Sequence, residues 1–482
     1  MKRILIIIGV FLLTNVVVTA IGVGLFFWRF VPRIPAVDFP TPQDQTEARD
    51  QDLTYLLNLT SIDHSFSKEA EAQFQAHVEQ MHEQVSSMSD AEFAMEVAAS
   101  VALADNGHTN VRIAYLADQL NSLPLRFFWF DDGLYIVRAH AEFAAFIGAQ
   151  VVAYDGTPPE EIVQHLKQYY GGNEPNVRFN SPYFFASPAA MHGLGVATNP
   201  DQVSLTLRLM DGKTQETTVL VEEKQTETMR VVDHALAKNA KEEVESGNDW
   251  RFLDPEMVTL AHYGMHPEKQ LWTDELPNDG FYIRMRITLD ADDVSLSKWL
   301  ADIQEQLKSI PVEYLVLDMR SNPGGDYTKT RTFAKAIANL VKPDGRIYTL
   351  TDGGTFSAAV VTAAFAKHGA SSKGNRSQIV GSQMGDREQF WAEGGGVLTL
   401  PNSGVKVSVS TGYHDWENGC TDWRRCYWLN IVMGVAAGKL DPDINAPLTF
   451  ADYSSGIDTT MQAVFEAEAV YSVDSHFDRN DE

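Results

Sequence analysis

The chain begins with an apolar run that is long enough to cross a membrane. Lys2 and Arg3 precede an uncharged, mostly apolar stretch, residues 4–28, which ends in aromatic side chains. A helix of that length crosses a hydrocarbon core of about 30 Å, and the terminal aromatic side chains suit the lipid interface. The pattern predicts a single-pass anchor over residues 1–34, with the N-terminus cytoplasmic and the rest periplasmic or extracellular. The small residues at 18–20 leave a cleaved signal peptide, and a secreted protein, as the alternative.

The next part of the chain has the spacing of helices. Between residues 43 and 104 apolar side chains recur every three or four positions, as at Phe74, Val78 and Met81. This spacing places them on one face of a helix, where they pack against a core. It predicts a small helical region over residues 35–111.

Short apolar runs then replace the helical spacing. The runs FFWF, LYIV, VVAYDG and VSLTLRLMDG are rich in aromatic and β-branched residues and are bounded by turn residues. They predict a β-rich domain over residues 112–223, with one helix that begins near Pro158 and Pro159. A charged connector over residues 224–275 follows, and its first half is expected to be helical.

From residue 276 to residue 482 strands alternate with helices, which predicts an α/β domain. The run EYLVLDM is apolar throughout, as expected for a strand buried on both faces. The whole chain is therefore expected to be a multidomain protein of the α/β (α+β) class.

The composition excludes nucleic acid as a partner. The 482 residues include 38 Lys and Arg against 65 Asp and Glu, a formal charge of −27. This negative field disfavours contact with phosphate backbones. The only cysteines, Cys420 and Cys426, lie in CTDWRRC, whose spacing matches no zinc-ligand pattern. A short disulfide in an oxidising compartment is one interpretation, and two reduced thiols packed in a loop is the other.

Three segments carry residue types suited to chemistry. The buried strand ends in a glycine-rich turn, residues 320–325, whose N–H groups could bind an oxyanion. Ser357 begins an Ala/Val-rich helix, where it could attack a carbonyl while the N–H of Ala358 binds the oxyanion. His108 lies in the turn DNGHT and could accept the hydroxyl proton. Taken singly, these features are also typical of an ordinary turn, a helix-capping serine and a surface histidine.

Taken together, the segments resemble a known family. The motifs LVLDMRSNPGG, GGTFSAA, IVGSQMGD, LTLPNSGVKVSVSTGY and DPDINAP occur in this order. They are similar to motifs of the tail-specific, or C-terminal processing, serine peptidases, in particular the tricorn-like and retinoid-binding-protein-like branch. Upstream, NGHTNV resembles the family's histidine turn, and LPLRFFWFDDGLYIV with IGAQVVAYDGTPPEEIV resembles a PDZ-like module. The resemblance covers most of the chain from about residue 104.

The resemblance implies a role for each candidate residue. Ser357 is expected to be the nucleophile and His108 the general base. The N–H groups of Ala358 and of Gly324 or Gly325 are expected to form the oxyanion hole. The resemblance also implies that the β-rich domain is PDZ-like and that the α/β domain is a peptidase core of the ClpP/crotonase-like type.

The sequence departs from the family's pattern at two places. Where the lysine-using branch has a Gly-Lys step after the serine, this chain has Gly385, Asp386 and Arg387. An arginine does not give up its proton near neutrality, so a Ser/Lys dyad is disfavoured. Where the tricorn-like branch has a glutamate that orients the histidine, this chain has Ala436. The acids that could substitute, each also typical of a solvated surface, are Glu388, Asp415 and Glu417.

Two principal functions remain for this sequence, beside a third, a PDZ-like scaffold that docks partner C-termini by strand addition. The sequence carries no signature of a metal, nucleotide or dinucleotide site, so no metal and no cofactor are expected. The first hypothesis is a membrane-anchored serine peptidase that cleaves peptides, unfolded proteins or C-terminal tails through an acyl-enzyme intermediate. The alternative is a catalytically weak or inactive protein of the same fold that binds an apolar or peptide ligand.

Overall fold

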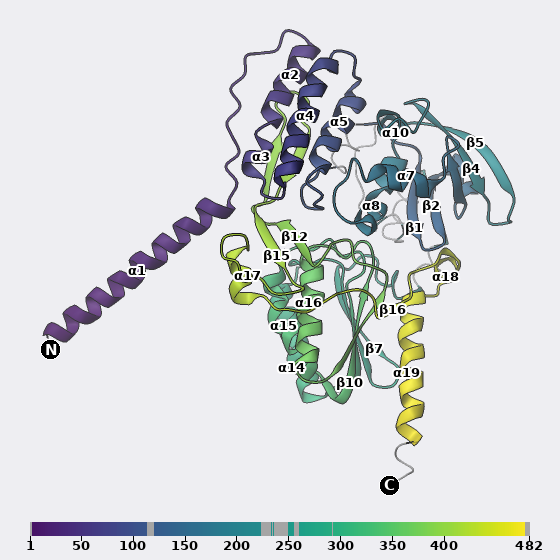
Figure 1. Ribbon diagram of the computed structural model, residues 1–482. Helices are drawn as coiled ribbons and strands as arrows, with labels where there is room; N and C mark the ends of the chain where they lie inside the picture. The colour runs from purple at the N-terminus through teal and green to yellow at the C-terminus, as the bar shows by residue number, and fades with distance from the viewer. Residues whose placement is uncertain are drawn as a thin grey trace.

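The computed structural model describes residues 2–112, 120–222, 233, 235, 249–254, 260–291 and 293–477, with side chains from residue 13 to residue 471 (Figure 1). Within these residues an N-terminal helix, a helical region, a β-rich domain and an α/β core follow one another. The predicted α/β fold class is confirmed. Most of the first part of the predicted connector, residues 224–259, lies outside the described residues.

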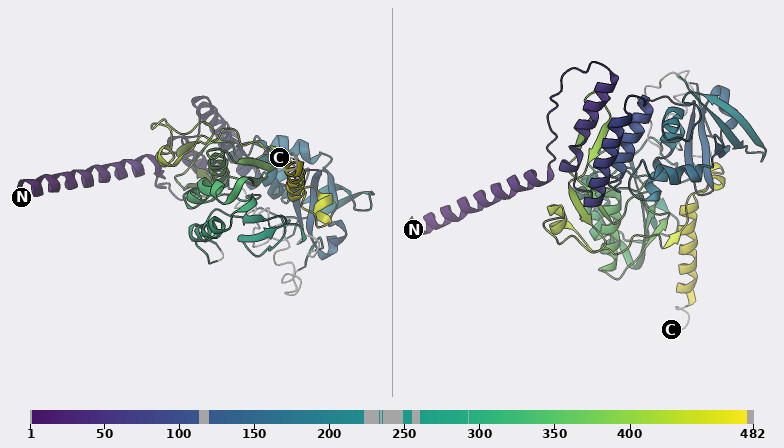
Figure 2. Two further views of the ribbon diagram at one scale, coloured as in Figure 1. Left: turned by 90° about the horizontal axis from the view of Figure 1, so that it is seen from below. Right: turned by 45° about the horizontal axis from the view of Figure 1, so that its top comes forward.

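The first helix, α1 (Lys2–Phe30), projects away from the body of the molecule (Figures 1 and 2). Its segment Leu13–Phe30 has a mean hydropathy of 1.6 and is almost wholly exposed. Apolar side chains on such a helix have no protein core to enter, so a lipid phase is the environment that suits them. Within the described residues α1 is the one helix long and apolar enough to cross a membrane, a property that a signal sequence shares.

The helical region has the helices that the spacing predicted. They are α2 (Gln45–Leu56), α3 (Leu59–Ile62), α4 (Lys68–Gln84) and α5 (Asp90–Ala102). Phe74, Val78 and Met81 are buried, as the spacing requires. The side chains of Ser67 and Ser89 each accept a hydrogen bond from a backbone N–H in the first turn of α4 and α5, respectively. These caps satisfy N–H groups that the helix itself leaves without a partner.

The β-rich domain is a six-stranded sheet in the order β1-β2-β3-β4-β5, with β6 paired to β2. All of its pairings are antiparallel. Its strands are β1 (Leu125–Phe130), β2 (Gly133–His140), β3 (Gln150–Tyr154), β4 (Gln202–Arg208), β5 (Thr214–Leu220) and β6 (Trp250–Phe252).

The helices of this domain outnumber the one that the sequence predicted. The predicted helix is α7 (Pro159–Leu166), and a short 3-10 helix, η1 (Ala141–Phe146), precedes it. Three further helices follow, α8 (Glu174–Asn180), α9 (Pro182–Phe185) and α10 (Pro188–Gly193). Each of these three has a proline in its first two positions, where the missing N–H costs nothing. The prolines mark helix starts here, although a proline-rich stretch reads as loop in the sequence.

The α/β core is built on a six-stranded sheet in the order β16-β11-β10-β9-β8-β7. The pairings from β8 to β16 are parallel, and β7 is antiparallel to β8. The strands are β7 (Leu271–Leu276), β8 (Gly280–Met285), β9 (Val312–Asp318), β10 (Val341–Thr351), β11 (Arg376–Gly381) and β16 (Ile444–Asn445). The apolar run predicted as a central strand is β9, and its Leu315, Val316 and Leu317 are fully buried.

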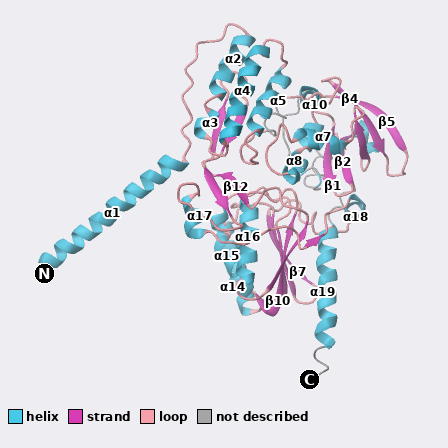
Figure 3. Ribbon diagram, viewed as in Figure 1, coloured by secondary structure: helices cyan, strands magenta, loops and turns pink. Residues whose placement is uncertain are grey.

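Helices cover both faces of this sheet (Figures 1 and 3). On one face are α14 (Leu296–Ser309), η2 (Tyr327–Lys329), α15 (Arg331–Ala336), η3 (Ile337–Asn339) and α16 (Ala358–Ser371). The other face packs against α19 (Thr459–Phe477), whose Met461 and Val464 are buried in a cluster with Tyr348 and Val380. The helices α17 (Trp428–Met433) and α18 (Phe450–Ser454) lie in the connections near the C-terminus.

One hairpin of the C-terminal part completes the core of the helical region. β12 (Gln389–Ala392) pairs with β15 (Gly412–Asp415), and between them β13 (Gly396–Thr399) pairs with β14 (Lys406–Val409) beside α3 and α4 (Figure 1). Leu398 and Val407 share a buried cluster with the helices. The buried carboxylate of Asp52 accepts the backbone N–H groups of Asn402 and Ser403 at 2.8 and 2.7 Å. The β13–β14 hairpin, which lies far along the chain, therefore completes the core of the N-terminal helices and is hydrogen-bonded to α2.

Candidate active site

The candidate residues of the core follow strands that end at one edge of the sheet. β9 leads into the glycine-rich turn at residues 320–325, β10 into the loop that carries Ser357, and β11 into the loop that carries Asp386. Because these strands are parallel, their carboxyl ends meet at the same edge, which is where open α/β sheets bind ligands.

Ser357 stands immediately before α16 in a backbone conformation that is unusual for serine. Its φ is 56° and its ψ is −123°, and its side chain makes no capping hydrogen bond to the helix. A non-glycine residue with such a φ carries strain of about 1–3 kcal/mol, and strain of this kind is concentrated at functional sites. The capping interpretation of this serine is therefore wrong, and its hydroxyl is left for another partner.

The glycine turn is packed directly against this serine. A Cβ atom added to Gly324 would lie 2.7 Å from the Cβ of Ser357 and 2.9 Å from the nitrogen of Ala358. Gly324 also has a φ of 99°, so only glycine fits at this position. The close approach places the glycine turn directly against Ser357 and Ala358.

The hydrogen bonds of the turn distinguish the candidate oxyanion donors. The N–H of Gly324 donates to Oδ1 of Asn322 at 2.9 Å, so it already has an acceptor. In the described part of the chain, the N–H groups of Gly325 and Ala358 have no hydrogen-bond acceptor. Since Ala358 follows Ser357 and Gly325 follows the glycine packed on it, these two N–H groups are the candidates for an oxyanion hole.

His108 is brought to this edge from the far N-terminal part of the chain. Its ring stacks on Phe356 with centroids 4.4 Å apart, and on Phe390 at 5.2 Å. Phe356 is the residue before Ser357, so the imidazole lies beside the segment that carries the hydroxyl. Gly107 permits this contact, because a Cβ there would lie 2.9 Å from the Phe356 ring.

The partner of His108 is a carboxylate that sequence reasoning missed. Nε2 of His108 lies 3.0 Å from Oδ2 of Asp386, and the two side chains are 17% and 5% exposed. A buried carboxylate in this contact orients an imidazole and stabilises its charged form. Among the described residues Nδ1 of His108 has no hydrogen-bond partner, and no hydrogen bond joins His108 to Ser357. Nδ1 is therefore the ring nitrogen of His108 that has no partner among the described residues.

A signal for Asp386 was present in the sequence. It lies in the motif IVGSQMGD, a few residues after the end of β11, where a side chain reaches the same sheet edge as Ser357. The family's pattern directs attention to the glutamate position at Ala436 and to the lysine step at Arg387, and neither of these indicates Asp386 as the acid.

The acids that could substitute for the family's glutamate have other partners. Glu388 accepts the N–H of Leu440 at 2.8 Å, and Asp415 accepts that of Asn418 at 2.8 Å. Glu417 pairs with Lys439 at 3.0 Å. The structure gives none of the three a contact with His108, and the carboxylate that contacts the imidazole is that of Asp386.

Arg387 has a structural task beside this pair. Its guanidinium donates to the carbonyl of Asp105 at 3.0 Å and to the carboxylate of Asp105 at 2.9 Å. Asp386 and Arg387 thus hold two points of the same turn, one at His108 and one at Asp105. Arg387 therefore stabilises the turn that carries His108. Because this position holds arginine, it offers no lysine that could act as a base.

Buried charges support the start of the glycine turn. Asp318, at the end of β9, accepts Nη1 of Arg284 and Nη2 of Arg320, each at 2.6 Å. Burial alone would raise the pKa of Asp318, but the positive charges of Arg284 and Arg320 outweigh it and hold that pKa below its usual value. Arg320 also donates to both oxygens of Asp458, at 2.7 and 2.8 Å. The cluster therefore ties the C-terminal segment to the residue that begins the turn.

A cavity of about 450 Å³ opens beside the same edge, between the β-rich domain and the core. Phe128 and Trp129 of β1 form one wall, and Arg320, Asp352 and Gly353 form another. A space of this size, with aromatic walls and a few charged groups, suits a short peptide segment or a small apolar molecule.

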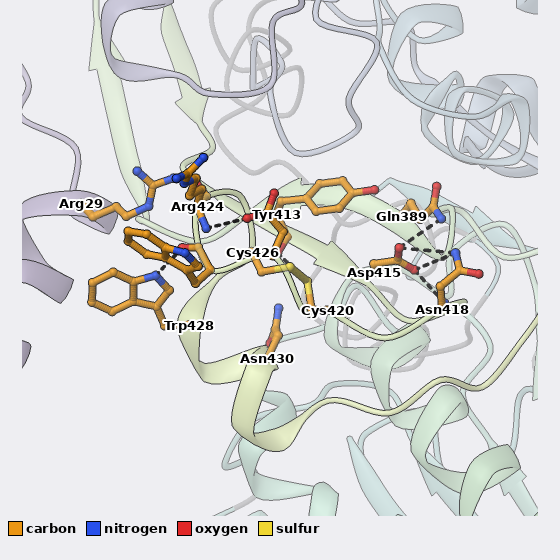
Figure 4. Close-up of a disulfide and its surroundings, with 12 residues drawn as sticks. Arg29, Gln389, Tyr413, Asp415, Asn418, Cys420, Arg424, Cys426, Trp428 and Asn430 are labelled. Carbon is orange, nitrogen blue, oxygen red and sulfur yellow. Dashed lines mark hydrogen bonds between the residues drawn. A yellow bond between two sulfur atoms is a disulfide. The ribbon is translucent and has the colours of Figure 1, made fainter.

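The remaining candidate residues are the two cysteines. The structure joins Cys420 and Cys426 in a disulfide (Figure 4). Over the described residues, no group of three or more His, Cys, Asp or Glu side chains is arranged to hold a metal ion.

Comparison with solved structures identifies the fold. The protein resembles mature CPAF complexed with lactacystin, with a TM-score of 0.51 and 13% identity over 89% of this chain and 98% of that chain. It also matches a photosystem II D1 C-terminal processing protease, with a TM-score of 0.37 and 14% identity over 83% of this chain and 93% of that chain. A putative S41 protease from Bacteroides fragilis NCTC 9343 matches with a TM-score of 0.31 and 13% identity, over 76% of this chain and 87% of that chain.

At these identities the likeness concerns the fold. The chain has the fold of mature CPAF. No protein-family model matches the sequence, and no curated protein sequence matches it.

Proposed function

We propose that this protein is a membrane-anchored serine peptidase that hydrolyses peptides or the C-terminal tails of proteins. One observation carries the proposal: the hydroxyl of Ser357 makes no capping bond and sits at a strained helix start against a glycine turn. A serine that only began a helix would gain stability from a capping bond and an ordinary φ. The fold shared with mature CPAF supports the same assignment.

In the proposed acylation step, Ser357 Oγ attacks the carbonyl carbon of the scissile peptide bond and His108 takes its proton. The negative charge on the carbonyl oxygen is bound by the N–H groups of Gly325 and Ala358. The carbon–nitrogen bond then breaks, and His108 returns the proton to the departing amine. Asp386 holds the imidazole and stabilises its positive charge during the transfer.

In the proposed deacylation step, a water molecule replaces the amine. His108 takes a proton from the water, and the hydroxide attacks the ester that Ser357 formed. The ester bond breaks, Ser357 recovers its proton from His108, and the carboxylic acid product leaves. No metal or cofactor is needed for either step.

The cavity between β1 and the sheet edge is the proposed place for the substrate chain. It adjoins Asp352 and Gly353, which precede Ser357 by a few residues. The β-rich domain, whose motifs resemble those of a PDZ-like module, contributes aromatic side chains to the wall of this cavity. A peptide entering between the domain and the core would thus pass the candidate nucleophile.

The proposed location is the outer side of a membrane, with α1 as the anchor. The exposed apolar helix supports the anchor, and the disulfide between Cys420 and Cys426 supports an oxidising compartment for the body. The alternative, secretion after removal of α1, predicts the same chemistry without the membrane.

A second candidate function is a binding protein of this fold that does not cut its ligand. It is favoured by the arrangement of His108, whose Nε2 is committed to Asp386 and which has no hydrogen bond to Ser357 among the described residues. In this case the cavity would hold an apolar or peptide ligand, and Ser357 would be chemically ordinary.

Labelling with a fluorophosphonate probe separates the two functions. We expect the wild-type full chain to be labelled and the Ser357→Ala variant to remain unlabelled and unable to hydrolyse peptides, while keeping the wild-type circular dichroism spectrum. Lactacystin, which is bound in the CPAF structure, is a second probe for the same serine. A folded wild-type protein that neither reacts nor hydrolyses peptides would favour the binding function, and peptide hydrolysis that survives in Ser357→Ala would exclude this serine as the nucleophile.

A further inference from the structure

We propose that the disulfide loop and the helix that follows it form a second contact with the membrane, beside α1. We define this membrane-contact patch as Trp423, Ile431 and Val432, on the loop closed by Cys420–Cys426 and on α17. The proposal rests on the membrane attachment part of the proposed function and is independent of the peptidase chemistry.

The disulfide loop and the start of α17, which carry the patch, lie next to Arg29 at the end of α1 (Figure 4). The ring of Phe26 on α1 is 5.4 Å from Tyr427 and 6.2 Å from Trp428, and that of Phe30 is 5.0 and 5.6 Å from the same two rings. Arg29 donates a hydrogen bond to the carbonyl of Arg424. The last turns of the apolar helix are thus packed on the loop and on the start of α17.

The chain that follows α1 is also fastened to the body. Oγ1 of Thr411 donates to the carbonyl of Phe30 at 2.6 Å. Pro32 lies so close to the β12–β13 connection that a Cβ on Gly396 would be 2.4 Å from its ring. The body is therefore fixed to the end of α1. If α1 crosses a bilayer, it holds the membrane-contact patch near the surface of that bilayer.

The exposed side chains of the patch are apolar, and they continue those of α1. Trp423, Ile431 and Val432 are 61%, 40% and 79% exposed, and Phe27 and Trp28 at the end of α1 are 57% and 63% exposed. Single exposed apolar residues are ordinary, but a group that adjoins an apolar membrane helix is not. Tryptophan in particular favours the level of the lipid headgroups, and the indole N–H of Trp428 already holds the loop through the carbonyl of Trp423 at 2.8 Å.

The charges around the patch suit an anionic lipid surface. Arg424 and Arg425 on the loop and Arg33 after α1 are exposed, in a chain whose formal net charge is −27. The acid in the loop, Asp422, is turned to the backbone, where it accepts the N–H of Arg424 at 2.9 Å. Apolar side chains flanked by arginines are the composition of surfaces that bind the headgroup region of membranes.

The test uses the full chain in vesicles of phosphatidylcholine and phosphatidylglycerol that contain a photoactivatable phospholipid. Mass spectrometry then reports which peptides carry lipid. We expect labelling of α1 and of residues 421–433, the latter at least about fivefold above the peptide that contains Met210, because apolar interfacial contact scales with buried apolar area. Met210 is the matched control: it is 66% exposed, on the β4–β5 hairpin, which lies on the side of the body away from α1 (Figures 1 and 2).

Two variants sharpen the result. Val432→Asp should lower the lipid labelling of residues 421–433 severalfold, whereas Met210→Asp should leave it unchanged. Labelling of α1 without labelling of residues 421–433 would overturn the membrane contact and leave the anchor standing. Absence of label on both would overturn the anchor and this inference together, and crosslinking of residues 421–433 only to a second protein chain would assign the patch to a protein partner instead. Fluorophosphonate labelling of Ser357 in the same vesicles tests the peptidase proposal separately.

Discussion

Ser89 and Ser357 both stand immediately before a helix, and their side chains behave in opposite ways. Ser89 has a φ of −71° and a ψ of 170°, and its hydroxyl accepts the N–H of Glu92 at 3.2 Å. Glu92 returns the interaction by accepting the N–H of Ser89 at 2.6 Å. Ser357 has a φ of 56° and makes no such bond. The same residue type at the same position therefore caps one helix and leaves its hydroxyl unused on the other.

The difference lies in the distance along the chain to the groups that hold each serine. Ser89 is satisfied by a residue in the first turn of its own helix, which is why a capping box can be read in a sequence. Ser357 is surrounded by Gly324, from the preceding strand connection, and by the Phe356–His108–Asp386 contact, which joins distant segments. Packing holds Ser357 in a conformation that its own helix would not choose.

The largest effect is expected from a substitution at Asp386, which tests whether the distant residues around Ser357 contribute to its reactivity. Replacing Asp386 with Asn removes the charge that faces the imidazole of His108. We expect kcat/KM for peptide hydrolysis to fall by about 10²–10⁴, mainly in kcat, because the charged imidazole loses its stabilisation while the substrate site is untouched. Steady-state kinetics on a fluorogenic peptide measure this fall.

The control for Asp386→Asn is Asp415→Asn, which changes an acid of the same neighbourhood that contacts Asn418 rather than His108. We expect wild-type kinetics from it. Equal losses in the two variants, or no loss in Asp386→Asn, would contradict the role of Asp386.

An intermediate effect is expected from closing the space beside Ser357. Gly324→Ala adds a methyl group that would lie 2.7 Å from the Cβ of Ser357, at a φ of 99°. Gly156→Ala is the matched control, because Gly156 has a φ of 83° and nothing within 4 Å of the added atom. Gly156→Ala should lose about 1 kcal/mol of stability from backbone strain, and Gly324→Ala should lose more, because its methyl group also clashes with Ser357 and Ala358.

Only Gly324→Ala should also lose peptidase activity and fluorophosphonate labelling, because only there does the methyl group displace the candidate nucleophile. Chemical denaturation and probe labelling of the two variants give both readouts. Wild-type labelling in a folded Gly324→Ala protein would show that the close packing has no bearing on the serine.

The smallest effect is expected at the capping serine. Ser89→Ala should lower the local opening free energy of α5 by about 1 kcal/mol, measured by hydrogen exchange, with no change in peptidase activity. The N–H of Ser89 holds the pKa of Glu92 below its usual value. Since the folded state depresses this pKa, the carboxylate stabilises α5 above the unfolded pKa of about 4.3 and loses its effect as the pH falls through the folded value.

A Glu92→Gln variant, which keeps an acceptor without the charge, isolates that pH dependence. Its difference from wild type in the exchange of α5 should be present at neutral pH and shrink in acid. A difference that persists unchanged in acid would mean that the charge of Glu92 contributes nothing to the cap.

The sequence allowed most elements to be predicted because their signals are local. The apolar face of α4 is readable from Phe74, Val78 and Met81, and the buried strand β9 from its unbroken apolar run. The candidates Ser357 and His108 were recognisable from motifs, but the acid was not. Asp386 follows the end of β11, which makes it a candidate, but Glu388 follows the same strand, and only the packing of His108 and its contact with Asp386 separate the two acids.

The chain by itself determined where helices and strands form, where an apolar segment suits a membrane, and which residue types stand at the ends of the parallel strands. Periodicity, turn residues and side-chain chemistry act over a few positions, so they are visible without coordinates. The tertiary structure decided which residues distant in the sequence come into contact. It places His108 against a carboxylate 278 positions away, and the β13–β14 hairpin in the core of the helical region. It also packs the start of α17 against the end of α1. Such contacts depend on how whole elements pack, and the free energy of that packing is shared by many residues, so no short stretch of sequence records it.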